Sequence, residues 1–276
     1  MAFSWRDVLC DVDLRSHVLD PLVRKGAYRA IASLLRTCRG PADGAANDFD
    51  AFGRAAVACW KEDKVCERAA RRGALRLLQW ARAHGCPWNN RTCASAARGG
   101  HLKVLQWARA NGCSWDASTC SWAAKQGHLE VLQWAVANDC PLDHRMCMYA
   151  AESGHLYVLQ WARANGCPWD SRTCSHAAGG GHLHVLQWAH ENGCPWSEYT
   201  CANAASGGHL QVLQWAHDNG CPWDHWTCRC AARAGQLAAL QWSTANGCPW
   251  RRDECLRLAE DNGHRNMTQW IQENYV

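Results

Sequence analysis

The sequence predicts an all-α solenoid of stacked antiparallel helix pairs, and two observations carry this prediction. A segment of 27 residues recurs along the chain, marked by a Leu-Gln-Trp tripeptide. Self-similarity at a fixed period of about 20 to 50 residues is typical of solenoids and propellers. No segment alternates apolar and polar residues with the period of two that a propeller blade needs. The repeated tryptophans are Trp80, Trp107, Trp134, Trp161, Trp188, Trp215 and Trp242, with a last copy one residue late at Trp270.

The first half of each period predicts a short helix, helix A. It begins after a side chain that accepts hydrogen bonds from the free amides of a helix start. Thr-Cys-x-x-Ala-Ala follows, so small residues three and four positions apart form a narrow face suited to close packing. Glycines such as Gly100 and Gly127 then end the helix in the left-handed conformation. The capping residues are Asn89, Asp116, Asp143, Asp170, Ser197 and Asp224.

The second half of each period predicts helix B, for example over residues 101–111. Its apolar face is wide, because Leu102, Leu105 and Trp107 leave only a thin polar stripe. Asn-Gly closes this helix, and a Cys-Pro-Trp turn leads to the next capping residue because proline stops helical continuation. We interpret the tryptophans of helix B and of the turn as core residues.

The repeat pattern predicts the domain organisation. Residues 1–50 hold no copy of the repeat and are expected to form a helical segment, and residues 51–61 a junction or half repeat. Residues 62–276 are expected to form eight repeats. These repeats span 62–88, 89–115, 116–142, 143–169, 170–196, 197–223, 224–250 and 251–276.

The motif Ala-Ala-x-x-Gly-His-Leu-x-Val-Leu, followed by Asn-Gly, resembles the core of an ankyrin repeat. The ankyrin unit has about 33 residues, and the missing residues all fall between Gly112 and Ala123, where ankyrin repeats carry a β-hairpin finger. The resemblance therefore implies a right-handed solenoid of finger-less repeats that binds partners on the helix A and loop side. Short repeats rich in Cys and Trp resemble those abundant in large DNA viruses and protists.

Two interpretations of residues 1–50 stay open. Apolar pairs before Thr37-Cys-Arg39 faintly resemble an F-box, a helical module that docks substrate receptors onto ubiquitin ligases. The Leu-Pro that opens that motif and the tryptophan after Cys-Arg are missing here. The alternative is a plain helical cap for the array.

The nineteen cysteines predict free thiols rather than a disulfide framework. Sixteen form eight pairs seven residues apart, from Cys59 and Cys66 to Cys248 and Cys255. Equivalent positions in stacked helices lie about 8 to 10 Å apart, too far for a disulfide, which needs Cα atoms within about 7 Å. A link within one period, such as Cys113 to Cys120, stays open. Because residues 1–19 lack the apolar stretch of a signal peptide, we expect an intracellular protein, cytoplasmic or nuclear (in the host cell if viral), and not secreted.

Other classes of function find no support in the sequence. One histidine per repeat cannot supply the four converging ligands of a zinc site, and candidate nucleophiles and bases all sit in repeated positions. We therefore expect no catalytic, metal or cofactor-binding residues. A net charge of +4 is weak for nucleic-acid binding. No run of 18 apolar residues is present to span a membrane.

Residues that vary between repeats predict the functional surface. We expect a monomeric, non-catalytic scaffold that binds a partner protein on a concave face of helix A and turn tips. The alternatives are a substrate-recognition subunit that docks a ubiquitin-ligase adaptor, and a thiol redox or metal-binding protein. The expected contact residues are Ser95, Arg98, Trp122, Lys125, Tyr149, Glu152, His176, Asn203 and Arg233 along helix A, and His144, Tyr199 and Trp226 at the turn tips.

Overall fold

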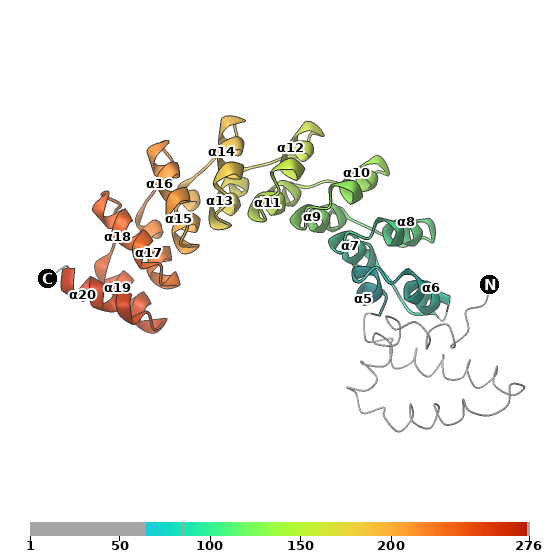
Figure 1. Cartoon of the computed structure of the whole chain (residues 1–276), viewed down its shortest axis with the longest axis horizontal. Coiled ribbons are helices and arrows are strands. Elements are labelled where there is room, and N and C mark those ends of the chain that lie inside the picture. The colour runs from blue at the N-terminus through green and yellow to red at the C-terminus, as the bar shows by residue number, and fades with distance from the viewer. Residues whose placement is uncertain (1–64, 84, 275–276) are drawn as a thin grey trace, which may run out of the picture. The chain divides into compact units, whose positions relative to one another are not determined.

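The protein is an all-α solenoid, as the sequence predicts. A computed structural model describes residues 65–83 and 85–274, and these residues form sixteen helices and no strand (Figure 1). The helices follow one another as eight antiparallel pairs, helix A with an odd number and helix B with an even number. The predictions for residues 1–50 and 51–61 lie outside the described residues.

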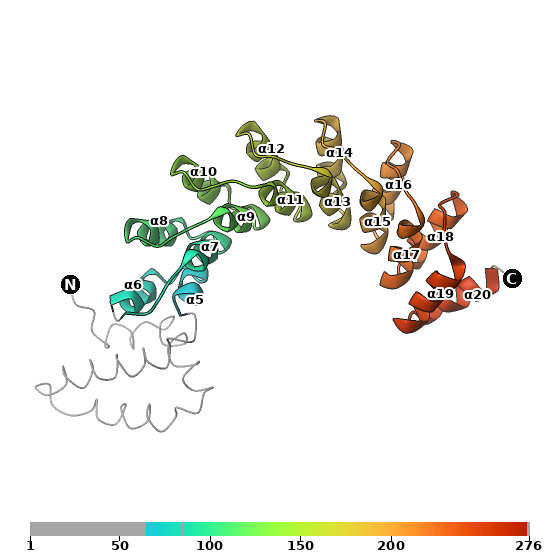
Figure 2. The same cartoon turned by 180° about the vertical axis from the view of Figure 1, so that it is seen from behind.

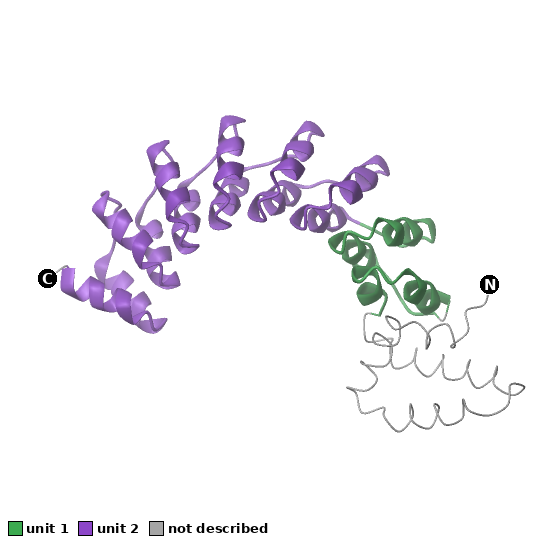
Figure 3. Cartoon of the chain, in the orientation of Figure 1, with its two compact units in different colours: residues 1–115 green, residues 116–276 purple. Residues whose placement is uncertain are grey.

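The chain divides into two compact units, residues 1–115 and 116–276 (Figure 3). The first unit contains α5 (Val65–Arg71), α6 (Leu75–Ala83), α7 (Asn90–Arg98) and α8 (Leu102–Ala110). The second unit contains α9 (Ala117–Lys125), α10 (Leu129–Ala137), α11 (His144–Glu152), α12 (Leu156–Ala164), α13 (Ser171–Gly179), α14 (Leu183–Glu191), α15 (Glu198–Ser206), α16 (Leu210–Asp218), α17 (His225–Ala234), α18 (Leu237–Ala245), α19 (Arg252–Asp261) and α20 (Arg265–Asn274).

The start of helix A is fixed by the predicted capping side chains. Asp116 Oδ1 accepts the backbone N–H of Ser118 at 3.0 Å, and Asp170 Oδ1 accepts that of Arg172 at the same distance. Each bond satisfies an amide that the helix itself leaves without a partner. A single residue also sets the boundary between helices A and B. Gly127 takes a φ of 76°, a backbone conformation that glycine adopts more readily than other residues.

Small residues bring the A helices of neighbouring repeats together. In the second unit, α9, α11, α13, α15 and α17 pack closely side by side, whereas α10, α12, α14, α16 and α18 scarcely contact one another. Side chains such as Cys147, Ala150 and Ala151 are fully buried in these contacts. Because the A helices are closer than the B helices, this unit curves with the A helices on its concave side (Figures 1 and 2).

In several repeats, the repeated histidine links the repeat to the one before it. His209 Nε2 lies 3.0 Å from the carbonyl oxygen of Gly179, and His264 Nε2 lies 3.0 Å from that of Arg233. The bond satisfies a carbonyl at the end of the preceding helix A. Gly181 makes room for the ring, because a Cβ there would lie 2.6 Å from His209 Nδ1. The sequence placed this histidine at a helix start without assigning it such a role.

The prediction that both tryptophan series belong to the core holds in full only at Trp80. Trp80 is 5% exposed, but Trp107, Trp134, Trp161, Trp188, Trp215 and Trp242 are only half-buried. The fully buried position is the leucine two residues earlier, as at Leu159 and Leu186.

Instead of filling the core, the tryptophans cover the B helices. Trp196 of a turn stacks on His190 of its own repeat, with centroids 3.8 Å apart, and meets Trp215 of the next repeat edge-on at 6.0 Å. In the first unit Arg82 lies 4.2 Å above Trp88, which meets Trp107 at 5.7 Å. Tryptophan suits positions where part of the side chain is covered and the rest meets water, and its ring face also attracts cations. The indoles therefore join neighbouring repeats without being fully buried.

Candidate protein-binding face

The variable positions of the A helices in the second unit make contacts between neighbouring repeats. Trp122 on α9 and Tyr149 on α11 stack with centroids 5.9 Å apart and planes 20° apart. Lys125 Nζ lies 4.9 Å from the centre of the Tyr149 ring. The three side chains therefore form one continuous patch across two repeats.

A chain of charges continues this patch to a third helix. Lys125 Nζ pairs with Glu152 Oε1 at 3.0 Å, and His176 Nδ1 lies 3.7 Å from Glu152 Oε2. All three side chains are partly exposed. Since exposed ion pairs contribute only about 0 to 1 kcal/mol, the cluster contributes more to a polar surface than to stability.

The next helix presents a polar side chain in the same row. Asn203 Nδ2 on α15 donates to the carbonyl oxygen of Ser175 on α13 at 3.2 Å. Gly179 leaves space beside it, because a Cβ there would meet Asn203 Cβ at 3.3 Å. Asn203 is thus held against the preceding helix and is only half-buried.

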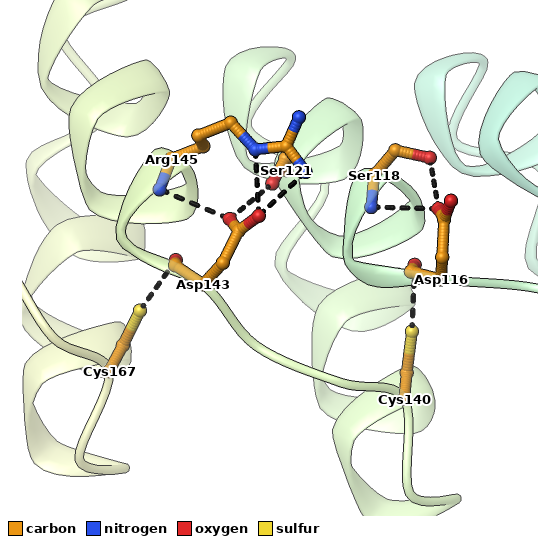
Figure 4. Close-up of polar contacts among 7 residues, drawn as sticks. All are labelled: Asp116, Ser118, Ser121, Cys140, Asp143, Arg145 and Cys167. Atoms are coloured by element: carbon orange, nitrogen blue, oxygen red, sulfur yellow. Dashed lines mark hydrogen bonds and ion pairs between the residues drawn. The ribbon is translucent and has the colours of Figure 1, made fainter.

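At the start of α11 and of α13, an arginine of the turn tip pairs with the capping aspartate. Arg145 Nε donates to Asp143 Oδ2 at 2.7 Å, and Ser121 Oγ of the preceding helix donates to Asp143 Oδ1 at 3.1 Å (Figure 4). Asp116 accepts the Ser118 hydroxyl in the same way. At the next tip, a hydrogen bond from Arg172 holds the pKa of Asp170 below its usual value.

Two exposed aromatic side chains stand at equivalent turn tips of neighbouring repeats. Tyr199 on α15 is 54% exposed and Trp226 on α17 is 38% exposed. Arg229 lies 4.3 Å above the Trp226 ring and pairs with Glu254 at 3.1 Å. Tyr199 and Trp226 are two of the three large apolar side chains that are exposed in the described part of the chain.

The structure brings ten of the twelve predicted contact residues onto the second unit. Of these, Tyr199, Trp226 and Arg233 are exposed and the other seven are half-buried. Ser95 and Arg98 lie half-buried on α7 of the first unit. Trp122 and Tyr149 pack on each other, so these two predicted contact residues also have a structural role.

Pairs of cysteine thiols are a feature that the sequence reasoning missed. Within one repeat, the thiol of helix A meets the thiol that follows helix B, 20 residues later. Cys147 Sγ lies 4.0 Å from the carbonyl oxygen of Cys167, and Cys167 Sγ donates to the carbonyl oxygen of Asp143 at 3.4 Å. A hydrogen bond between the two thiols raises the pKa of Cys147 and lowers that of Cys167.

All sixteen cysteines in the described ranges are free thiols, and fifteen of them are buried. In the part of the chain that the structure describes, no three His, Cys, Asp or Glu side chains gather where a metal ion could be held. None of the helices described has the length and hydropathy that a membrane span requires.

Comparison with known proteins adds one similarity to these observations. No protein-family model matches the chain, and no curated protein sequence matches it either. Among solved structures, the chain is similar to the human ASB11 ankyrin repeat domain, with 18% identity and a TM-score of 0.46 over 57% of this chain and 84% of that one. By its own helix pairs, left-handed glycines and histidine links, the chain is an all-α solenoid of helical repeats.

Proposed function

We propose that the chain is a non-catalytic scaffold that binds a partner protein on the concave side of its second unit. The observation that carries the proposal is the pair Tyr199 and Trp226, exposed at equivalent positions of two closely packed helices. Aromatic residues are enriched among the few that dominate binding energy at interfaces. Concave surfaces of stacked repeats are the surfaces that solenoid proteins use for binding.

The surrounding residues fit the edge of such an interface. His144, Glu152, His176 and Arg233 are polar side chains on the same row of helices. Interfaces place apolar anchors at their centre and polar residues at their rim. We therefore place the centre of the proposed site at Tyr199 and Trp226 and the patch around Trp122 and Tyr149 beside it.

Affinity capture with matched variants tests this proposal. The double variant Tyr199→Ser, Trp226→Ser should melt as the wild type does, because both side chains are exposed, yet lose a protein that the wild type enriches. The control is Tyr157→Ser on α12, which removes an equally exposed tyrosine (49%) from a B helix. The proposal fails if the control variant loses the same protein, or if the double variant retains it.

The alternative function as substrate-recognition subunit of a ubiquitin ligase depends on residues 1–50. Capture of a ligase adaptor by the full chain, and its loss when residues 1–50 are deleted, would support it. Capture of the same partners by both forms would favour the plain scaffold.

A further inference from the structure

Six successive repeats contain the same buried pair of thiols. In each pair, one cysteine lies on helix A and the other directly after helix B, so the pair spans the two ends of one repeat. In all six pairs, the thiol of the second cysteine donates to the carbonyl oxygen of the residue four positions before the first cysteine, at 3.3 to 3.5 Å. The pairs are Cys93 and Cys113, Cys120 and Cys140, Cys147 and Cys167, Cys174 and Cys194, Cys201 and Cys221, and Cys228 and Cys248.

The pairing differs from the order of cysteines along the chain. Cys140 and Cys147 are only seven residues apart, yet the sulfur of Cys140 points to the carbonyl oxygen of Asp116, at 3.5 Å, while Cys147 meets Cys167. Figure 4 shows the equivalent bonds of Cys140 and Cys167 to the two capping aspartates. The fold therefore selects one partner for each thiol.

We propose that these pairs are redox sites, in which a hydroperoxide converts the two thiols of one repeat into a disulfide. A disulfide needs sulfurs that can approach to about 2.05 Å with their Cβ atoms near 3.8 Å apart. Cys147 Sγ lies 4.0 Å from the carbonyl oxygen of Cys167, and Cys167 Sγ lies against the first turn of the helix that carries Cys147, so rotation of the two side chains can bring the sulfurs together.

The reaction has two balanced steps. The thiolate of Cys167 attacks one oxygen of hydrogen peroxide, which gives a sulfenic acid and, after protonation of the leaving hydroxide, one water. The thiol of Cys147 then attacks that sulfur, forms the S–S bond and releases a second water. Two thiols lose two electrons and two protons, and one peroxide is reduced to two waters.

Two observations define where and how the reaction occurs. The hydrogen bond from Cys147 lowers the pKa of Cys167, which makes Cys167 the attacking thiol. Both sulfurs are buried, so only a small uncharged oxidant reaches them, during local opening of the turn, and the reaction is slow.

Cys255 provides an internal control. It is buried in α19 like the helix A cysteines, and burial raises its pKa to about 11. The residue 20 positions later is Tyr275, so Cys255 has no partner at the repeated spacing. It should not enter a disulfide under conditions that close the pairs.

Tryptic mapping of the folded, full-length protein after peroxide treatment tests the proposal. Cleavage at arginine places Cys147 alone in peptide 146–163 and Cys167 alone in peptide 164–172. We expect these two peptides to be linked, and dithiothreitol to release them. Cys255, in peptide 253–257, should stay available to an alkylating reagent.

Matched reactions give the controls. Cys147→Ser should abolish the link and leave Cys167 as a thiol or a higher oxide. Peroxide added in denaturant should instead favour links between cysteines seven residues apart, such as peptide 126–145 with 146–163. The proposal is overturned if the folded protein yields those links, if Cys255 is cross-linked as readily, or if peptides 146–163 and 164–172 remain unlinked.

Discussion

The rings of Trp122 and Tyr149 stack on each other across two neighbouring repeats, with centroids 5.9 Å apart. They occupy the same position of helix A, 27 residues apart, in a row where most other repeats have a small or polar residue. Two departures from the repeat pattern thus compensate each other. The pair contributes to stability as well as to the proposed binding surface.

We expect a double-mutant cycle of Trp122→Ala and Tyr149→Ala to give a coupling free energy of about 0.5 to 1.5 kcal/mol, the range for stacked aromatic pairs. Urea unfolding of the wild type, both single variants and the double variant measures it. The control cycle pairs Trp122→Ala on α9 with Tyr199→Ala on α15, three A helices further along, where additivity is expected. Equal coupling in both cycles would show that the stack itself contributes nothing.

The burial of leucine and tryptophan on helix B leads to a second prediction. Leu159 is fully buried, whereas Trp161 is only half-buried. Leu159→Ala should therefore cost about 2 to 5 kcal/mol, because it leaves a closed cavity, and Trp161→Ala should cost less, because water can fill the space left by a partly exposed ring. Denaturant unfolding of the two variants decides the order. A larger loss of unfolding free energy for Trp161→Ala than for Leu159→Ala would show that this tryptophan is a core residue.

The helices were predictable from the sequence because their signals are local. Asp116 caps a helix through an amide two residues away, and Gly127 ends one through its own backbone angle. Repetition of these signals at a fixed interval made the fold class unambiguous. The wide apolar face of helix B also predicted that Trp161 faces other side chains.

Contacts that depend on the packing of whole helices were harder to predict. The apolar face of helix B does not reveal that Leu159 is enclosed while Trp161 lies at its margin. The neighbour of Cys147 depends on how helix B returns the chain, so the order of cysteines in the sequence does not reveal that it lies beside Cys167. The stack of Trp122 on Tyr149 could have been predicted, because residues one period apart lie side by side in neighbouring repeats.

The histidines predict how stability changes with pH. Burial lowers the pKa values of His155 and His182 below the usual value, which is near 6.5 for the unfolded chain. Between the folded and unfolded pKa values the unfolded chain binds more protons, so the free energy of unfolding rises with pH there. This stability is complete above about pH 6.5 and is lost as the pH falls through the folded pKa.

Unfolding in urea across this pH range measures the effect. The variant His155→Gln, His182→Gln should show a shallower loss of stability on acidification. Glutamine is compatible with the position, since Gln236 occupies it before α18. Lys103→Gln, which removes an exposed charge, should leave the slope unchanged. The same slope for the double histidine variant and the wild type would argue against histidine as the cause.

Asp139 predicts a stabilising substitution. It is the single non-glycine residue with positive φ (63°) among the residues described. Glycine stands at the equivalent position in other repeats, for example Gly112 and Gly166, with φ of 80° and 75°. A left-handed conformation costs an L-residue roughly 1 to 2 kcal/mol, less for Asp, and glycine avoids this cost but loses more entropy on folding. We therefore expect Asp139→Gly to raise the free energy of unfolding by about 0.5 to 1 kcal/mol.

The reverse change is the matched control for this substitution. No atom lies within 4 Å of a Cβ built on Gly166, so Gly166→Asp changes the backbone preference without a steric clash. It should destabilise the protein by a similar amount, about 0.5 to 1 kcal/mol. Urea unfolding of both variants at one pH gives the two values. If Asp139→Gly and Gly166→Asp shift the free energy of unfolding in the same direction, backbone strain at Asp139 is not the cause of the change.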